Sequence, residues 1–218
     1  MTLLLYAVTD RQAVSGSGIG GAPLSLVRSA GLAAVVSGSQ MPAPEATEEK
    51  IWEYERVVES LMDASTILPV RFGTTLEHED DAGEFLARHR DGLSQGLDRV
   101  RGTVEMGVRV QWRAGVDAPL EEPSDSGTAY MLARLTLLRS ARGIAERLAP
   151  LLSMARLGKV AVMPRRGVAV LAAYLVDRGR ADQFAAWCDR LHDGLEQAQL
   201  ACTGPWPPYS FVTEDTGR

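Results

Sequence analysis

The sequence predicts an α+β protein made of two α/β domains, residues 1–100 and 101–218, the second ferredoxin-like and ending in an extended C-terminal tail. Strand-like apolar runs alternate along the chain with segments whose apolar residues recur at helical spacing. At Thr103 this spacing changes to strict alternation, which indicates that a new sheet starts there. From Thr103 onward the expected order is strand, helix, strand, strand, helix, strand, which is the βαββαβ order of a ferredoxin-like domain.

In the first domain we expect buried strands at residues 3–8 and 32–37, and an amphipathic helix that follows an acidic turn and ends near Ala64. The glycine-rich loop at 15–21 has the glycine spacing of a dinucleotide-binding motif. The helix and the acidic residue that this motif requires do not follow it. We therefore expect a mobile surface loop that tolerates alanine at Gly18 and Gly20.

The stretch from Ile67 to Leu76 joins a strand to a helix and carries several backbone constraints. Pro69 has no N–H for a ladder, so it predicts an edge strand or a strand that stops early. Thr74 and Glu77 have the spacing of a capping box, which predicts a helix from near Thr75. The expected buried side of this helix is Phe85, Leu86, His89, Leu93 and Leu97. Arg71 is expected in a structural salt bridge, with a ligand-binding role as the alternative.

In the second domain we expect a strand from Thr103 to Trp112, a long helix at 127–149, a hairpin of strands at 157–163 and 168–176, a helix at 180–195 and a strand at 197–203. The helix at 180–195 should place Phe184, Trp187, Cys188 and Leu191 inward. The long helix has two apolar rows, the first being Met131, Leu135, Leu138, Ala145, Leu148 and Leu152. The second row is Leu137, Ile144 and Leu151. One row can cover the sheet while the other meets a partner, or a neighbouring helix of the same chain can cover the second row.

The composition bounds the function. A net charge of -5 disfavours a nucleic-acid partner, and no apolar run is long enough to span a membrane. Without a leader-like start, we expect a cytoplasmic protein. Cys188 and Cys202 lack a metal-binding spacing and are expected to be small buried hydrophobic residues. The three histidines and the acidic run after His78 form no catalytic or metal motif, so we expect no enzyme, metal or cofactor.

Three segments together resemble one known family. They are residues 66–75 (TILPVRFGTT), 127–134 (GTAYMLAR) and 203–211 (TGPWPPYSF). They are similar to the gas vesicle accessory proteins of the F/L type and occur in that family's order, and residues 3–8 also fit. One departure is Tyr54, at a position where the family pattern leads us to expect a histidine.

The resemblance implies a cytoplasmic, vesicle-associated protein that binds the hydrophobic gas vesicle shell protein during vesicle formation, alongside other gas vesicle accessory proteins. A soluble protein that offers an apolar groove or a sheet edge could bind such a subunit. The candidate partner-binding residues are Arg71, Phe72, Leu137, Ile144, Leu151, Trp206, Tyr209 and Phe211. The tail aromatics dock along a partner's groove or, alternatively, on the first domain. Two other functions stay open: a minor structural component of the mature vesicle, and a small-molecule enzyme whose pocket includes Arg71 and the glycine loop.

Overall fold

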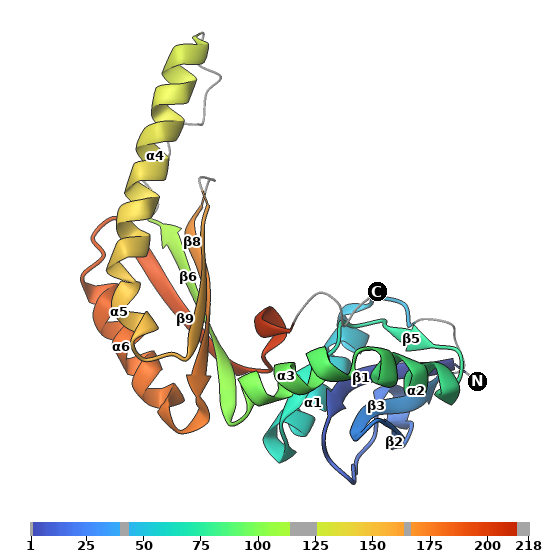
Figure 1. Cartoon of the computed structure of the whole chain (residues 1–218). Coiled ribbons are helices and arrows are strands. Elements are labelled where there is room, and N and C mark those ends of the chain that lie inside the picture. The colour runs from blue at the N-terminus through green and yellow to red at the C-terminus, as the bar shows by residue number, and fades with distance from the viewer. Residues whose placement is uncertain (1, 40–43, 114–125, 164–166, 213–218) are drawn as a thin grey trace. The chain divides into compact units, whose positions relative to one another are not determined.

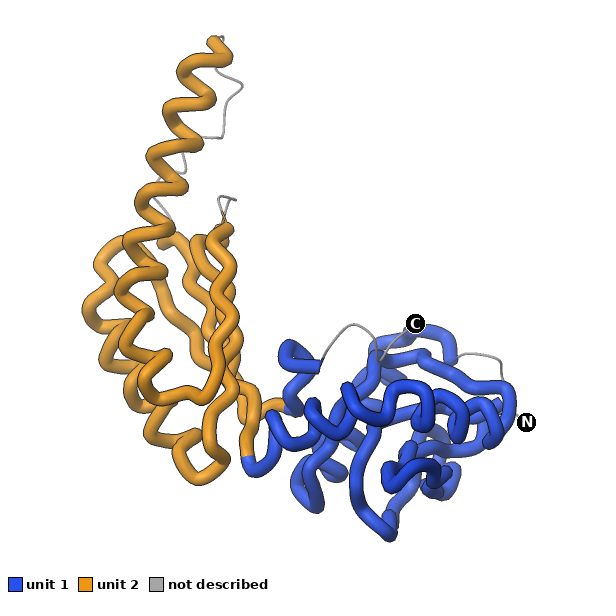
Figure 2. Tube along the Cα trace, viewed as in Figure 1, with its two compact units in different colours: residues 1–102, 207–218 blue, residues 103–206 orange. Residues whose placement is uncertain are grey.

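The computed structural model describes residues 2–39, 44–113, 126–163 and 167–212, and contains two antiparallel sheets with their helices (Figure 1). The chain divides into unit 1, Met1–Gly102 with Pro207–Arg218, and unit 2, Thr103–Trp206 (Figure 2). The sequence analysis assigned the whole tail to the second domain. The structure instead places residues 207–212 in unit 1, because Pro207, Pro208 and Phe211 are buried there.

The sheet of unit 1 is built around its first strand. It contains β1 (Thr2–Thr9), β2 (Leu24–Ser29), β3 (Leu32–Ser39), β4 (Ile67–Pro69) and β5 (Thr75–Leu76). The order is β2-β3-β1-β4, with β5 also paired to β1. The sequence analysis missed β2. It forms a hairpin with β3 through Ala30 and Gly31, whose φ angles of 53° and 84° suit a two-residue turn.

Three helices belong to unit 1: α1 (Glu48–Ala64), α2 (Glu79–Arg88) and α3 (Arg90–Val100). The predicted end of α1 near Ala64 agrees with the structure, and the Thr47 side chain caps its start by accepting from the Lys50 N–H. The single helix predicted after residue 75 is wrong, because the structure has two helices that meet at His89.

The edge position of the strand with Pro69 is confirmed, since β4 ends the sheet order. The helix start predicted near Thr75 is wrong. Thr75 and Leu76 pair with β1 as β5 instead, and the hydroxyl of Thr74 donates to the Arg71 carbonyl at 2.9 Å. The helix begins at Glu79, where the His78 N–H donates to the Asp81 carboxylate. Thr74 and Glu77 have the spacing of a capping box, but pairing of the next residues with the distant strand β1 prevents a helix from starting there.

Unit 2 has a four-stranded antiparallel sheet in the order β7-β8-β6-β9. Its strands are β6 (Thr103–Trp112), β7 (Leu157–Val162), β8 (Val168–Asp177) and β9 (Ala198–Trp206). The helices α4 (Gly127–Arg147), α5 (Ala149–Leu152) and α6 (Ala181–Asp193) lie on one side of this sheet (Figure 1). No described helix of unit 2 covers the other side, which we call the open face. Strand β9 runs farther than predicted, because Trp206 still pairs with Glu105 of β6.

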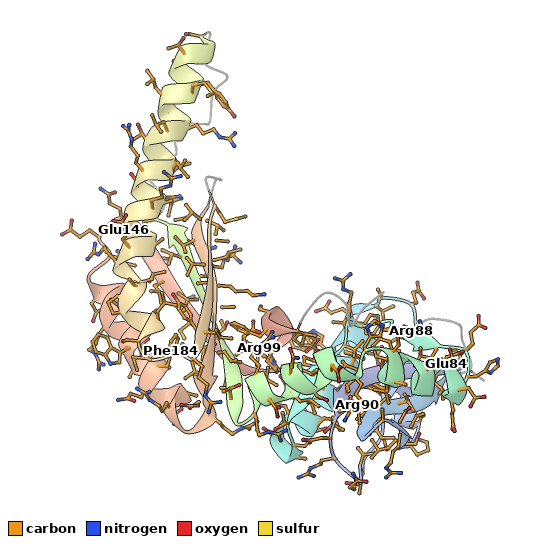
Figure 3. The ribbon with its side chains drawn as sticks, in the orientation of Figure 1. Glu84, Arg88, Arg90, Arg99, Glu146 and Phe184 are labelled. Carbon is orange, nitrogen blue, oxygen red and sulfur yellow. The ribbon has the colours of Figure 1, made fainter. Side chains whose placement is uncertain are left out.

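Helix α6 covers the sheet with fewer residues than predicted. Phe184, which points from α6 toward the sheet, and Cys188 are fully buried (Figure 3). The Phe184 ring packs against Tyr174 with centroids 5.2 Å apart. Trp187 was predicted to face inward but is exposed, and the Arg190 guanidinium lies over its ring at 4.6 Å. An aromatic at the boundary of a helical face satisfies the apolar period without being in the core.

Candidate interaction surfaces

The two apolar rows of the predicted long helix run along α4 and continue into α5, and the structure changes the roles assigned to them. Leu137, Ile144 and Leu151, the row predicted for a partner, are 6%, 8% and 0% exposed. They form the core of unit 2 and do not offer a surface. The other row is uncovered in part: Met131, Leu135 and Leu152 are 63%, 39% and 46% exposed, whereas Leu148 is buried. The rotation of α4 about its axis decides which row meets the sheet, and sequence spacing does not set that rotation.

The first part of α4, residues 127–136, extends beyond the ends of the strands (Figure 1). We call this segment the α4 overhang. All ten residues are described, and each is exposed or half-buried. Its large apolar side chains are Tyr130, Met131, Leu132 and Leu135, each at least 39% exposed. A run of exposed apolar side chains on one helix segment is typical of an interaction surface.

The open face of the unit 2 sheet carries further exposed apolar side chains. Leu157 of β7, Leu171 of β8 and Trp206 of β9 are 44%, 39% and 40% exposed. Trp206 is one of the predicted partner-binding residues, and the structure places it on a strand instead of a free tail. Because side chains alternate across a strand, this face is separate from the one that the helices cover.

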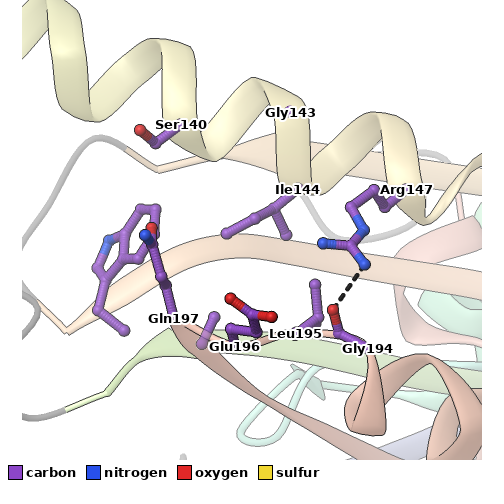
Figure 4. Close-up of a pocket in the computed structure, with 10 residues that line it drawn as sticks. Ser140, Gly143, Ile144, Arg147, Gly194, Leu195, Glu196 and Gln197 are labelled. Atoms are coloured by element: carbon purple, nitrogen blue, oxygen red, sulfur yellow. Dashed lines mark hydrogen bonds between the residues drawn. The ribbon is translucent and has the colours of Figure 1, made fainter.

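A cleft of about 540 Å³ opens between α4 and the start of β9 (Figure 4). The sequence analysis missed it, because its walls come from three separate segments. Its lining residues are Trp112, Ser140, Gly143, Ile144, Arg147, Gly194, Leu195, Glu196, Gln197 and Ala198. Arg147 closes one end by donating to the Gly194 carbonyl at 2.6 Å. The indole N–H of Trp112 is buried and has no hydrogen-bond partner within the described part of the chain. The cleft thus combines polar groups with a few apolar side chains such as Ile144 and Leu195, and it could take a small polar side chain or ligand.

In unit 1, Tyr54 of α1 organises an aromatic cluster under β1 and β4. Its ring stacks on Tyr6 at 5.1 Å and meets Phe72 edge-on at 5.4 Å. Its hydroxyl donates to the Val70 carbonyl at 2.7 Å, and burial raises the pKa of Tyr54. A neutral hydroxyl that ties a helix to the chain after β4 is a structural group. Phe72 is therefore partly covered by its own unit.

Arg71 does not have the salt bridge that the sequence analysis expected. The side chain is exposed, and none of the ion pairs among the described residues includes it. Its neighbours Val70 and Phe72 turn inward instead. A free surface guanidinium is available to a partner, so the ligand-binding alternative for Arg71 stays a prediction.

Residues 207–212, the last that the structure describes, pack within unit 1. Tyr209, in the short 3-10 helix Tyr209–Phe211, donates to the Glu55 carboxylate of α1 at 3.2 Å. Phe211 is 3% exposed, and its carbonyl accepts from Arg99 of α3 at 3.5 Å. Burial raises the pKa of Glu55, repulsion from Glu59 adds to this, and the hydrogen bond from Tyr209 opposes it. Tyr209 and Phe211 thus follow the alternative in which the tail docks on the first domain.

The glycine-rich loop is fixed to the sheet of unit 1 and is not a free surface loop. Residues 19–21 form a 3-10 turn, and the Ile19 N–H donates to the Tyr6 hydroxyl at 2.9 Å. A Cβ on Gly18 would lie 2.8 Å from the Ser37 Oγ and closer still to the Tyr6 hydroxyl. The tolerance of alanine predicted at Gly18 is therefore wrong, because this glycine makes a close approach to buried polar groups.

Few of the described side chains are placed to bind a metal ion or to act as a nucleophile. Within the described ranges, no group of three His, Cys, Asp or Glu side chains is placed to hold a metal ion. The imidazole of His192 is already hydrogen-bonded, because its Nδ1 accepts from the Leu200 N–H at 3.1 Å. Cys188 and Cys202 are free thiols that hydrogen-bond to each other, which raises the pKa of Cys188 and lowers that of Cys202. No described helix is long and apolar enough to cross a membrane.

Comparison with known proteins gives a match along both units. The family model described as "Gas vesicle synthesis protein GvpL/GvpF" matches residues 2–213. The chain is 30% identical to gas vesicle protein L of a Streptomyces species, over 98% of this chain and 97% of that protein. It is 26% identical to gas vesicle protein F1 of Halobacterium salinarum, over 83% of this chain and 77% of that protein.

Two solved structures share the fold. The crystal structure of GvpF from Microcystis aeruginosa gives a TM-score of 0.83 at 17% identity, covering 97% of this chain and 99% of that one. GvpF from Anabaena sp. PCC7120 gives 0.84 at 18% identity, covering 97% and 96%. At such identities the likeness concerns the arrangement of helices and strands, which is therefore common to these three proteins.

Proposed function

This chain belongs to the GvpL/GvpF family of gas vesicle proteins, and from this premise we propose that it is an assembly factor that binds the hydrophobic shell subunit during vesicle formation. The observation that carries the proposal is the family match over residues 2–213, which includes both units. A shell subunit that has not yet assembled exposes apolar surface and strand edges, and both favour aggregation. A protein that covers this surface until assembly keeps the subunit available.

Exposed apolar side chains support binding through unit 2. Twelve large hydrophobic side chains of the described residues are exposed, and ten of them belong to unit 2. The two in unit 1 are Ile51 and Trp52 of α1. Because apolar surface that the fold leaves uncovered is the usual material of an interface, unit 2 is the better candidate for the binding unit.

The finer fold class belongs to the same proposal. The strand order β7-β8-β6-β9, with every neighbouring pair antiparallel, supports a ferredoxin-like class for unit 2. We place the protein in the cytoplasm at growing gas vesicles, with the shell subunit and other gas vesicle accessory proteins as its partners. A role as an enzyme has no support from a motif in the sequence or from a metal cluster among the described residues.

The test is capture from cells that make gas vesicles. A tagged copy of the chain is purified before and during vesicle formation, and the bound proteins are identified by mass. We expect the shell subunit in the captured material, with more of it during formation than after. The control is a tagged copy from cells that lack the shell gene, which shows what binds without the subunit.

Washed mature vesicles provide the second measurement. If the chain stays on them in fixed proportion to the shell and never captures free subunit, it is a structural component and the assembly role is wrong. A melting temperature raised by several degrees with NAD or ATP would instead support the enzyme alternative.

A further inference from the structure

The α4 overhang and the turn after it carry an apolar seam of the kind that pairs two helices. Met131, Leu135 and Leu138 are spaced four and three residues apart, which is the spacing of alternating core positions in a helix pair. Met131 and Leu135 are exposed, and Leu138 is half-buried. Residues 127–136 are all described and bury no side chain. A helix segment whose side chains are not buried by the described residues is marginally stable in water, so the seam contributes little to the fold that they form.

Positive charges flank the seam on both sides. Arg134 precedes Leu135, Arg139 follows Leu138, and both guanidinium groups are exposed. The helix contains four arginines and one acidic residue, Glu146, which lies near its end and points away from the sheet (Figure 3). None of the ion pairs among the described residues uses an arginine of α4. The residues that flank a seam set the choice of partner through their charges.

The same charges disfavour a second copy of this chain as the occupant. In a parallel pair, the flanking position of Arg134 faces the position five residues later on the other helix, which is Arg139. In an antiparallel pair that places Met131 of one helix near Leu138 of the other, Arg134 lies close to Arg134 of the second copy. Either arrangement brings like charges together at the edge of the seam, whereas carboxylates at the same places attract.

We propose that the overhang docks one helix of another protein, a helix whose apolar row is flanked by carboxylates. Met131, Leu135 and Leu138 meet that row, and Arg134 and Arg139 pair with its acids. The inference rests on the proposed function only in taking the owner of the helix to be a gas vesicle protein. The surface and the chemistry of its partner are new to the proposal.

Synthetic peptides test the chemistry without knowledge of the partner. Three helical peptides are used. The first two have the same apolar seam and differ only at the flanking positions, which are Glu in one and Lys in the other. The third copies residues 127–147 of this chain. Binding to the full-length protein is measured by fluorescence anisotropy at low and high salt. We expect the Glu peptide to bind about tenfold or more tightly than the other two, and to weaken as salt rises.

Variants tie the binding to the overhang. Met131→Ala with Leu135→Ala should weaken the Glu peptide about tenfold or more, because the seam is lost. Arg134→Glu with Arg139→Glu keeps the seam and the helix propensity and should transfer the preference to the Lys peptide. Leu171→Ala, on the open sheet face and 39% exposed like Leu135, should leave binding unchanged. Circular dichroism and melting temperature confirm that each variant is folded.

Other outcomes overturn the inference. Equal binding of the Glu and Lys peptides means that the charges select nothing. A dimer in sedimentation that Leu135→Asp dissociates assigns the surface to a second copy. Binding to anionic lipid vesicles and to no peptide assigns it to a membrane. If both double variants still capture the shell subunit, this surface is refuted and the proposed function is kept. If the Glu peptide binds selectively but no shell subunit is captured, the proposed function is refuted and the surface is kept.

Discussion

The hydroxyl of Tyr209 donates to the carboxylate of Glu55, at 3.2 Å from one oxygen and 3.3 Å from the other, although 154 residues separate them in the chain. Glu55 lies on α1 and Tyr209 lies in the last described segment. This contact joins the last described segment to α1 of unit 1. The pKa of the Glu55 carboxyl group is raised, mainly because the group is buried and also because it is repelled by Glu59.

The raised pKa of Glu55 predicts a pH dependence. A carboxyl group with a higher pKa in the folded state stabilises the fold below its ordinary value, about 4.3, and this contribution is lost as the pH rises through the raised value. We expect Glu55→Gln, which keeps an acceptor for Tyr209, to gain stability relative to the parent as the pH rises from about 4 to neutral. Melting temperatures across this range measure it, with exposed Glu77→Gln as the control. Parallel curves for Glu55→Gln and the parent would contradict the prediction.

Two aromatic residues near the C-terminus should differ sharply in their effect on stability. Phe211 is 3% exposed and Trp206 is 40% exposed. We expect Phe211→Ala to lower the free energy of unfolding by about 3 kcal/mol or more, because the substitution leaves a cavity in unit 1. Trp206→Ala should cost less than half as much. Urea unfolding followed by circular dichroism compares them, and a cost for Phe211→Ala as small as that expected for Trp206→Ala would contradict the prediction.

Gly18→Ala should destabilise unit 1 by about 1–3 kcal/mol, because the new methyl group meets the Tyr6 and Ser37 hydroxyls. These two hydroxyls lie 3.0 Å apart, so neither moves without losing the other. The matched control is Gly92→Ala in α3, where a Cβ has no neighbour within 4 Å and helix propensity favours alanine. Chemical denaturation gives both values. If Gly18→Ala leaves the free energy of unfolding unchanged, the loop is a mobile surface loop as the sequence predicted.

The two rows of α4 should separate stability from binding. Ile144→Ala removes a side chain that is 8% exposed, and we expect a loss of about 2–4 kcal/mol. Leu135→Ala removes one that is 39% exposed, and its effect should stay within about 0.5 kcal/mol. Thermal unfolding of the two single variants is sufficient. A large loss at Leu135 would mean that the overhang already packs against its own chain.

The sequence alone determined the elements whose signal is local. The helix that ends at Ala64, the alternating strand Thr103–Trp112 and the hairpin strands of unit 2 all follow from periodicity within one segment. The three segments that resemble the family were also recognisable from the sequence, and the family match over residues 2–213 confirms that resemblance.

Only the tertiary structure decided the features that depend on distant partners. Thr75 and Leu76 form a strand because Leu4 and Leu3 of β1 pair with them, which overrides a good local capping signal. Helical spacing defines two rows along α4 and α5, but the position of the sheet decides that Leu137, Ile144 and Leu151 are buried and that Met131 and Leu135 are not. Tyr209 and Phe211 belong to unit 1 for the same reason: the groups that bury them, on α1 and α3, lie more than a hundred residues earlier in the chain.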